Sequence, residues 1–111
     1  MKDKIRFDLS DDERTIIIKA LNMLRNHLSM QEQSTIYIDE LIIKINDNHK
    51  FELDIFDAKI VINALNNMRY KLKNENKPRD DVNNIILKMI DETDSKKKRV
   101  LRMTMIGNVR K

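Results

Sequence analysis

Hydrophobic residues follow a helical stripe twice along this chain. In residues 10–32 the stripe consists of Ile17, Leu21, Leu24 and Leu28. In residues 54–76 it consists of Val61, Leu65, Met68 and Leu72. Steps of three or four residues predict an amphipathic helix over each range. Residues suited to N-terminal capping stand at the two predicted starts: Ser10 with Glu13, and Asp54 with Asp57.

A shorter apolar stripe follows each of these helices after a polar break. Residues 31–35 form the first break, and residues 75–80, which include Pro78, form the second. The stripes that follow are Ile38, Leu41, Ile42 and Ile45, and then Val82, Ile85, Ile86 and Met89. We therefore expect a second, shorter helix in each half, joined to the first by a short connection as an αα-hairpin.

The two hairpins resemble one another in sequence. When the chain is shifted by 44 positions, residues 7–47 align with residues 51–91 without a gap, and 12 of the 41 aligned positions are identical. Such a period is typical of a repeated supersecondary unit. Neither hairpin can bury its stripes alone. The pattern therefore predicts a mainly α fold in which two tandem αα-hairpins pack as a pseudo-two-fold four-helix domain.

Three short stretches alternate between apolar and polar residues. Their apolar members are Ile5, Phe7 and Leu9, then Phe51 and Leu53, and finally Leu101, Met103 and Met105. Alternation with period two is compatible with a short β ribbon formed from the termini. The simpler interpretation, which we prefer at this point, is that Phe7, Leu9, Phe51 and Leu53 cap the helical core.

Charge divides the 111-residue chain into a body and a tail. All 18 acidic residues precede Ser95, so residues 1–95 have a net charge of −3 and form the predicted single domain. The tail, residues 96–111, carries seven positive and no negative side chains: Lys96, Lys97, Lys98, Arg99, Arg102, Arg110 and Lys111. Any nucleic-acid contact is expected from this tail, through phosphates. The alternatives are a solvated terminus, or a strand or helix ordered against the body or a partner.

Few residues in this sequence suggest chemistry. There is no cysteine, and neither His27 nor His49 has a partner at metal-ligand spacing, so we expect no metal site and no cofactor. No order of residues suggests a catalytic triad. The N-terminus lacks an apolar signal region, and no apolar run approaches the ~20 residues that span a membrane. We expect a cytoplasmic protein that is not an enzyme.

Two polar residues recur at the same place in both hairpins, beside the main stripe. They are the pair Asn22 and Asn66 and the pair Arg25 and Arg69. One interpretation is an inter-repeat contact, in which they bond to the other hairpin. The other is a paired polar patch, which makes these four the candidate partner-binding residues. The broad apolar arc of the first helix also allows a homodimer.

The pattern Phe7-x-Leu9-Ser10-x-x-Glu13, followed by Ala20-Leu21-Asn22-x-x-Arg25-Asn26-x-Leu28, covers about a quarter of the chain. It resembles small helical accessory proteins of AT-rich Gram-positive bacteria and of their phages and plasmids. The resemblance implies an accessory protein of a mobile element and carries no activity over. We expect a non-enzymatic interaction protein, a small regulator or inhibitor that binds a protein partner. The alternative is a DNA- or RNA-binding accessory protein that uses the tail.

Overall fold

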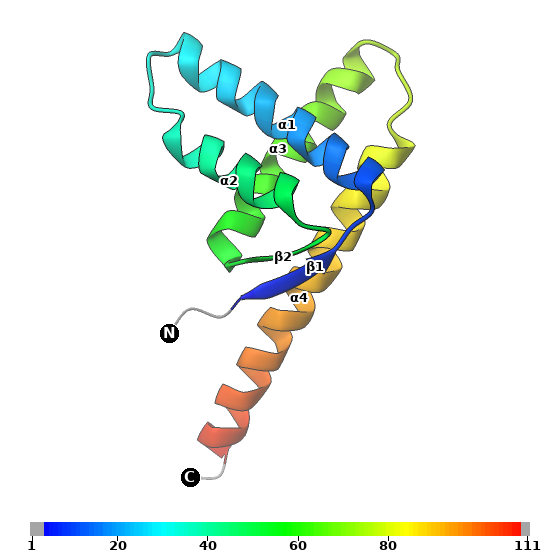
Figure 1. The fold of residues 1–111 in the computed structure, drawn as a ribbon. Coiled ribbons are helices and arrows are strands. Elements are labelled where there is room, and N and C mark those ends of the chain that lie inside the picture. Colours follow the sequence, from blue (N-terminus) through cyan, green and yellow to red (C-terminus); the bar gives the residue numbers. More distant parts are fainter. Residues whose placement is uncertain (1–3, 110–111) are drawn as a thin grey trace.

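A computed structural model describes the backbone of residues 4–109 and the side chains of residues 4–94. The elements, in chain order, are β1 (Ile5–Asp8), α1 (Asp11–Met30), α2 (Ile36–Asp47), β2 (Lys50–Leu53), α3 (Ile55–Asn74) and α4 (Asp80–Val109). The fold is mainly helical, as the periodicity predicts, and it also contains a small two-stranded antiparallel sheet (Figure 1).

Helices α1 and α3 cross at the centre of the fold, where each packs against the other (Figure 1). Helix α2 covers α1, and α4 covers α3, so each hairpin contributes one central and one outer helix. Leu21 of α1 and Leu65 of α3 are completely buried. Ala20 and Ala64 are also buried between the central helices, where small side chains let the two backbones approach closely.

Both predicted helix starts are confirmed. The hydroxyl of Ser10 accepts a hydrogen bond from the backbone N–H of Glu13, whose carboxylate accepts one from the Ser10 N–H at 3.0 Å. This is a complete capping box. Asp54 caps α3 through its carboxylate, which accepts a hydrogen bond from the backbone N–H of Asp57 at 2.7 Å.

The alternating segments near residues 5–9 and 50–53 do form a β ribbon. Strand β1 pairs antiparallel with β2, and Phe7 lies opposite Phe51 with ring centroids 5.6 Å apart. The apolar residues of both strands are buried, so the ribbon also covers the core. The ribbon pairs the N-terminal segment with the linker between the hairpins. A ribbon formed from the two termini would instead pair the N-terminal segment with the C-terminal one.

Helix α4 differs from the short second helix expected for residues after 80. It runs for 30 residues to Val109 and passes residue 95 without a break, so the stretch of Leu101, Met103 and Met105 is helical and the strand interpretation is wrong there. Between Pro78 and Gly107 the sequence contains no glycine or proline that would end a helix. The side chains of the predicted tail, from Lys96 to Lys111, lie outside the described residues. Within the described part, no helix is long and apolar enough to cross a membrane.

An ion pair connects the start of α1 with α4. The Nζ of Lys88 donates to Glu13 Oε2 at 2.8 Å and to Oε1 at 3.1 Å. Burial alone would raise the pKa of Glu13, but the hydrogen bonds from Lys88 and from the Ser10 amide outweigh it and hold the pKa below its usual value. The contact joins the two hairpins directly.

This pair predicts a dependence of stability on pH. Because folding lowers the pKa of Glu13, the contribution is present above the ordinary carboxyl pKa and is lost as pH falls through the folded pKa. We expect the free energy of unfolding to fall between about pH 6 and about pH 3, and Lys88→Gln to make that fall smaller. Urea unfolding at a series of pH values measures it. Lys19→Gln, an exposed lysine on α1, is the control. An unchanged slope in Lys88→Gln would refute the assignment.

Candidate functional site

The two predicted partner-binding arginines contact the second helix of their own hairpin. Arg25 Nε donates to Oδ1 of Asp39 in α2. Arg69 Nη1 donates to Oδ1 of Asn83 in α4 at 3.4 Å. The expected inter-repeat contact is therefore wrong for both arginines, because each central helix turns this side toward its own outer helix. A role in partner binding stays a prediction.

In the first hairpin this contact is electrically balanced. Asp39 accepts from Arg25 and also from the hydroxyl of Thr35 at 3.0 Å. The hydrogen bond from the Arg25 guanidinium, helped by that of Thr35, lowers the pKa of Asp39. Asn22, the other predicted residue here, is exposed on α1. The charges of Arg25 and Asp39 cancel, which leaves no net charge at the contact.

In the second hairpin the same region is a positively charged hollow of about 340 Å³ between α3 and α4. We call it the basic groove; its lining residues are Asn66, Arg69, Tyr70, Lys73, Arg79 and Asn83. It thus contains two of the four predicted partner-binding residues. The side chains of Lys73 and Arg79 have no hydrogen-bond or ion-pair partner among the residues that the structure describes.

The charge of the basic groove arises where the two hairpins differ in sequence. The residues 44 positions before Tyr70, Lys73, Arg79 and Asn83 are Asn26, Ser29, Thr35 and Asp39. The second hairpin thus gains two cations and loses the carboxylate that balances Arg25 in the first. Lys73 and Arg79 do not recur, so a search for shared residues missed them; the cluster of cations in the second copy is the signal that could have found them.

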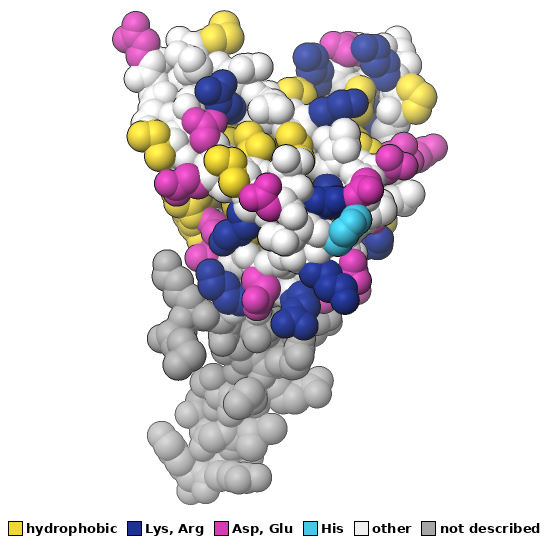
Figure 2. Space-filling view, viewed as in Figure 1, with side chains coloured by type: hydrophobic (Ala, Val, Ile, Leu, Met, Phe, Trp, Pro, Cys, Tyr) yellow, Lys and Arg dark blue, Asp and Glu magenta, His cyan; other side chains and the backbone are white. Residues whose placement is uncertain are grey.

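A second feature is an exposed apolar surface on the outer side of α2, continued onto the start of α3. This α2 apolar surface consists of Ile36, Tyr37, Ile43 and Phe56, which are between 48% and 67% exposed. Figure 2 shows hydrophobic side chains gathered over the α2 side of the molecule. Large apolar side chains grouped on a surface are typical of an interaction site.

Tyr37 is fixed within this surface. Its ring meets the ring of Phe56 edge to face with centroids 6.1 Å apart, and its hydroxyl donates to the carboxylate of Asp57. The hydrogen bond to Asp57, together with burial, raises the pKa of Tyr37 to about 12. The tyrosine is therefore neutral and held in place across the physiological range.

A second hollow, of about 430 Å³, lies between α1 and α3. Its lining is mainly small or apolar: Ala20, Met23, Leu24, His27, Ala64 and Asn67. His27 is exposed there. The hollow brings no pair of titratable groups together, so it offers no acid–base chemistry.

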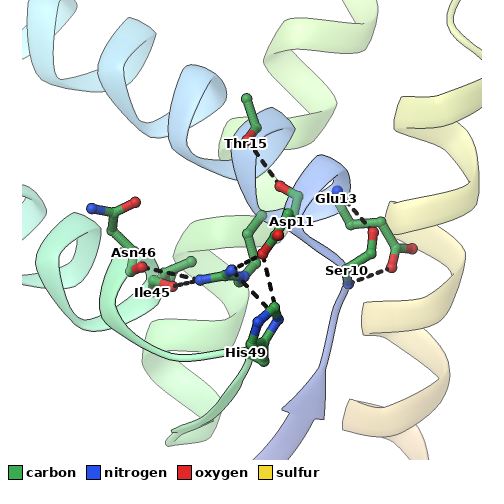
Figure 3. Close-up of polar contacts among 8 residues, drawn as sticks. Ser10, Asp11, Glu13, Thr15, Ile45, Asn46 and His49 are labelled. Atoms are coloured by element: carbon green, nitrogen blue, oxygen red, sulfur yellow. Dashed lines mark hydrogen bonds and ion pairs between the residues drawn. The ribbon is translucent and has the colours of Figure 1, made fainter.

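A polar cluster around Arg14, which the sequence analysis did not single out, joins α1 to the end of α2 (Figure 3). Arg14 Nη1 donates to the backbone oxygen of Asn46 at 3.0 Å and to that of Ile45 at 3.3 Å. Its other terminal nitrogen contacts Asp11 and lies 3.5 Å from Nδ1 of His49. The arginine satisfies carbonyls that the end of a helix leaves unpaired, which is a structural role.

No group of three or more metal-ligating side chains is close enough to hold a metal ion within residues 4–94. The basic groove and the α2 apolar surface are two candidate surfaces for binding. Comparison with known proteins adds no further candidate: no protein-family model, no curated protein and no solved structure matches the chain.

Proposed function

We propose that this chain is a non-enzymatic interaction protein, a small regulator or inhibitor that binds a protein partner through the α2 apolar surface. The observation that carries the proposal is the exposure of Ile36, Tyr37, Ile43 and Phe56 on one side of the fold. Aromatic and aliphatic side chains of this size are typical anchors at the centre of protein interfaces.

The composition of α2 supports this function. Ile38, Leu41 and Ile45 already fill the core side of the helix, yet Ile36 and Ile43 lie on the opposite side. A helix that is apolar on both sides is ordinarily covered on both sides. Within this chain α1 covers one side. A partner protein would cover the other.

Comparison of the hairpins shows that an outer helix can be built without the apolar residues Ile36 and Tyr37. The counterparts of Ile36 and Tyr37 are Asp80 and Asp81, which are exposed in the first turn of α4. Acidic residues suit the start of a helix better than isoleucine or tyrosine does. Ile36 and Tyr37 therefore sit where solubility and helix capping both favour a polar residue, which supports selection for binding.

We also propose that the hairpins are related by a pseudo-two-fold axis that passes between Phe7 and Phe51. Support comes from the strand register, since these two counterparts face one another. The hydrogen bond from Gln33 N to Leu28 O closes the first hairpin turn, and its counterpart from Lys77 N to Leu72 O closes the second. Under this symmetry, positions that differ between the hairpins are the ones free to carry function.

The double variant Ile36→Asp, Ile43→Asp tests the proposed function. We expect capture from a nuclease-treated lysate of the host to recover a partner with the wild-type chain, and the double variant to lose it. Each buried apolar side chain contributes about 1.5–3 kcal/mol to association, so losing two weakens binding by at least about a hundredfold. Isothermal titration with the purified partner measures the loss.

Leu87→Asp, on the exposed side of α4, is the control, because it places one carboxylate at another exposed aliphatic position outside the α2 apolar surface. It should retain the partner. Equal retention by the double variant would contradict the proposal. If the capture recovers a second copy of this chain, and analytical ultracentrifugation shows a dimer, the surface mediates self-association and the proposal of an external partner is wrong.

A further inference from the structure

We propose that the basic groove binds the phosphates of a single-stranded nucleic acid, with Tyr70 stacking on a base. The inference goes beyond the proposed function and does not depend on it, because the basic groove and the α2 apolar surface have no residue in common. It also adds a site distinct from the basic tail.

The cations of the groove come from α3 and from the turn before α4, and they meet at one place. Arg69 and Lys73 stand four residues apart on α3, and therefore on the same side of that helix. Arg79 immediately precedes α4 and lines the same hollow. Three positive side chains around about 340 Å³ form a concave site of a size suited to a phosphate and its sugar.

The geometry leaves these cations available to a ligand. The bond from Arg69 to Asn83 uses one of the donors of the guanidinium and orients the rest. Lys73 and Arg79 contribute unused charges, as the described residues show no carboxylate paired with either. Three like charges without a counterion repel one another, so they are costly to keep together unless an anion binds there.

The first hairpin shows that the fold does not require this charge. There Ser29, Thr35 and Asp39 occupy the corresponding positions, and the hairpin still closes, with Arg25 bonded to Asp39. A purely structural requirement would be met equally well by those residues in the second hairpin. The replacement of the carboxylate by Asn83 frees Arg69 from neutralisation and supports a binding role.

Tyr70 decides between the phosphate-bearing ligands. Its ring is 67% exposed on the edge of the groove. A phosphorylated peptide would use the cations and leave this ring without a role. Bases of a single strand have free faces that stack on aromatic rings while the backbone follows a basic groove. The side-chain amides of Asn66 and Asn83 add donors and acceptors for sugar or base edges.

The test uses the full chain and a fluorescent oligothymidylate, with binding followed by anisotropy over a range of salt. The groove variant Lys73→Ser, Arg79→Thr, Asn83→Asp installs the residues of the first hairpin. We expect its affinity at about 50 mM salt to fall at least tenfold, and the slope of log K against log salt to become shallower by about 1.4–2. Tyr70→Ala should weaken binding without changing the slope.

The control Lys19→Ser, Lys59→Thr, Asn63→Asp makes the same change of charge at exposed positions outside the groove. It should bind at least fivefold more tightly than the groove variant. Replacing Lys96, Lys97, Lys98 and Arg99 by Gln in the full chain measures the share of the tail separately. In NMR spectra the side-chain amide signals of Asn66 and Asn83 should shift on binding, also in this tail variant.

Three results would overturn the proposal. The first is equal affinity of the groove variant and its control. The second is complete loss of binding in the tail variant, with no shift at Asn66 or Asn83. The third is a phosphoserine peptide that binds the wild-type groove more tightly than the oligothymidylate does, since that would assign the site to a phosphoprotein.

Discussion

Leu65→Ala is expected to lower the free energy of unfolding by about 2–5 kcal/mol. Leu65 is completely buried in α3, one of the two helices that cross at the centre of the fold. Truncation removes apolar contacts and leaves a cavity that rigid neighbouring helices can fill only in part. Urea unfolding followed by circular dichroism measures the change, with thermal melts as a second readout.

Lys59→Ala, an exposed change in the same helix, is the control and should alter stability by less than about 0.5 kcal/mol. Leu21→Ala, at the corresponding position of α1, should cost about as much as Leu65→Ala, because Leu21 is also completely buried. A loss for Leu65→Ala no larger than the control would mean that the main stripe does not form the core.

Arg14→Ala should lower the free energy of unfolding by about 1.5–3 kcal/mol, the range for hydrogen bonds that involve a charged group. The arginine side chain is 12% exposed and donates to two backbone carbonyls at the end of α2. Without it these carbonyls lose their partner, and the end of α2 loses its connection to α1. Hydrogen exchange should also rise at the amides of residues 45–49 before it rises elsewhere.

Arg14→Lys separates charge from geometry. A lysine keeps the positive charge but lacks the planar fork that reaches Ile45 and Asn46 together, so it should recover less than half of the loss. The second hairpin has Ala58 at this position, fully buried. If Arg14→Ala were as stable as the wild type, the first hairpin would need the arginine no more than the second does.

Local signals in the sequence predict most of the helical framework. The caps at Ser10 and Asp54 use side chains within three residues of the groups they bind, and the stripes depend on spacing within one helix. Such short-range features can be read directly from the residues. The full burial of Leu21 and Leu65 follows from the same stripes.

Contacts between elements are harder to predict. Arg14 bonds to carbonyls 31 and 32 residues away, and a backbone acceptor leaves no trace in residue identity. Arg25 bonds to Asp39 because α2 lies beside that face of α1. A helical wheel shows which residues share a face of one helix, but it does not show which other helix packs against that face. Helix α4 continues past residue 95, where the sequence contains no residue that would end a helix. A basic run is equally compatible with a solvated tail, so the sequence does not decide between the two.

For the candidate surfaces too, local features can be predicted from the sequence and contacts between elements cannot. Asn66 and Arg69 attract notice because they recur in both hairpins, yet the basic groove depends on residues that do not recur, Lys73 and Arg79. Lys73 is in α3 and Arg79 is in the turn before α4, so the path of that turn must be known before their proximity is evident. Recurrence therefore does not identify every residue that lines a candidate surface, and the difference between the hairpins has to be compared as well.

The pairing of β1 with β2 has a consequence for how the chain acquires its structure during synthesis. The ribbon brings Phe7 next to Phe51, which is made 44 residues later, so β1 stays without its partner strand until the second half has begun to emerge. Closing so long a loop carries an entropic cost that local helix formation does not. The α1–α2 hairpin can therefore form first, while Ile5 and Phe7 remain exposed to solvent. The completed ribbon then offers β1 to α4 and β2 to α3, the contacts that join it to the second hairpin.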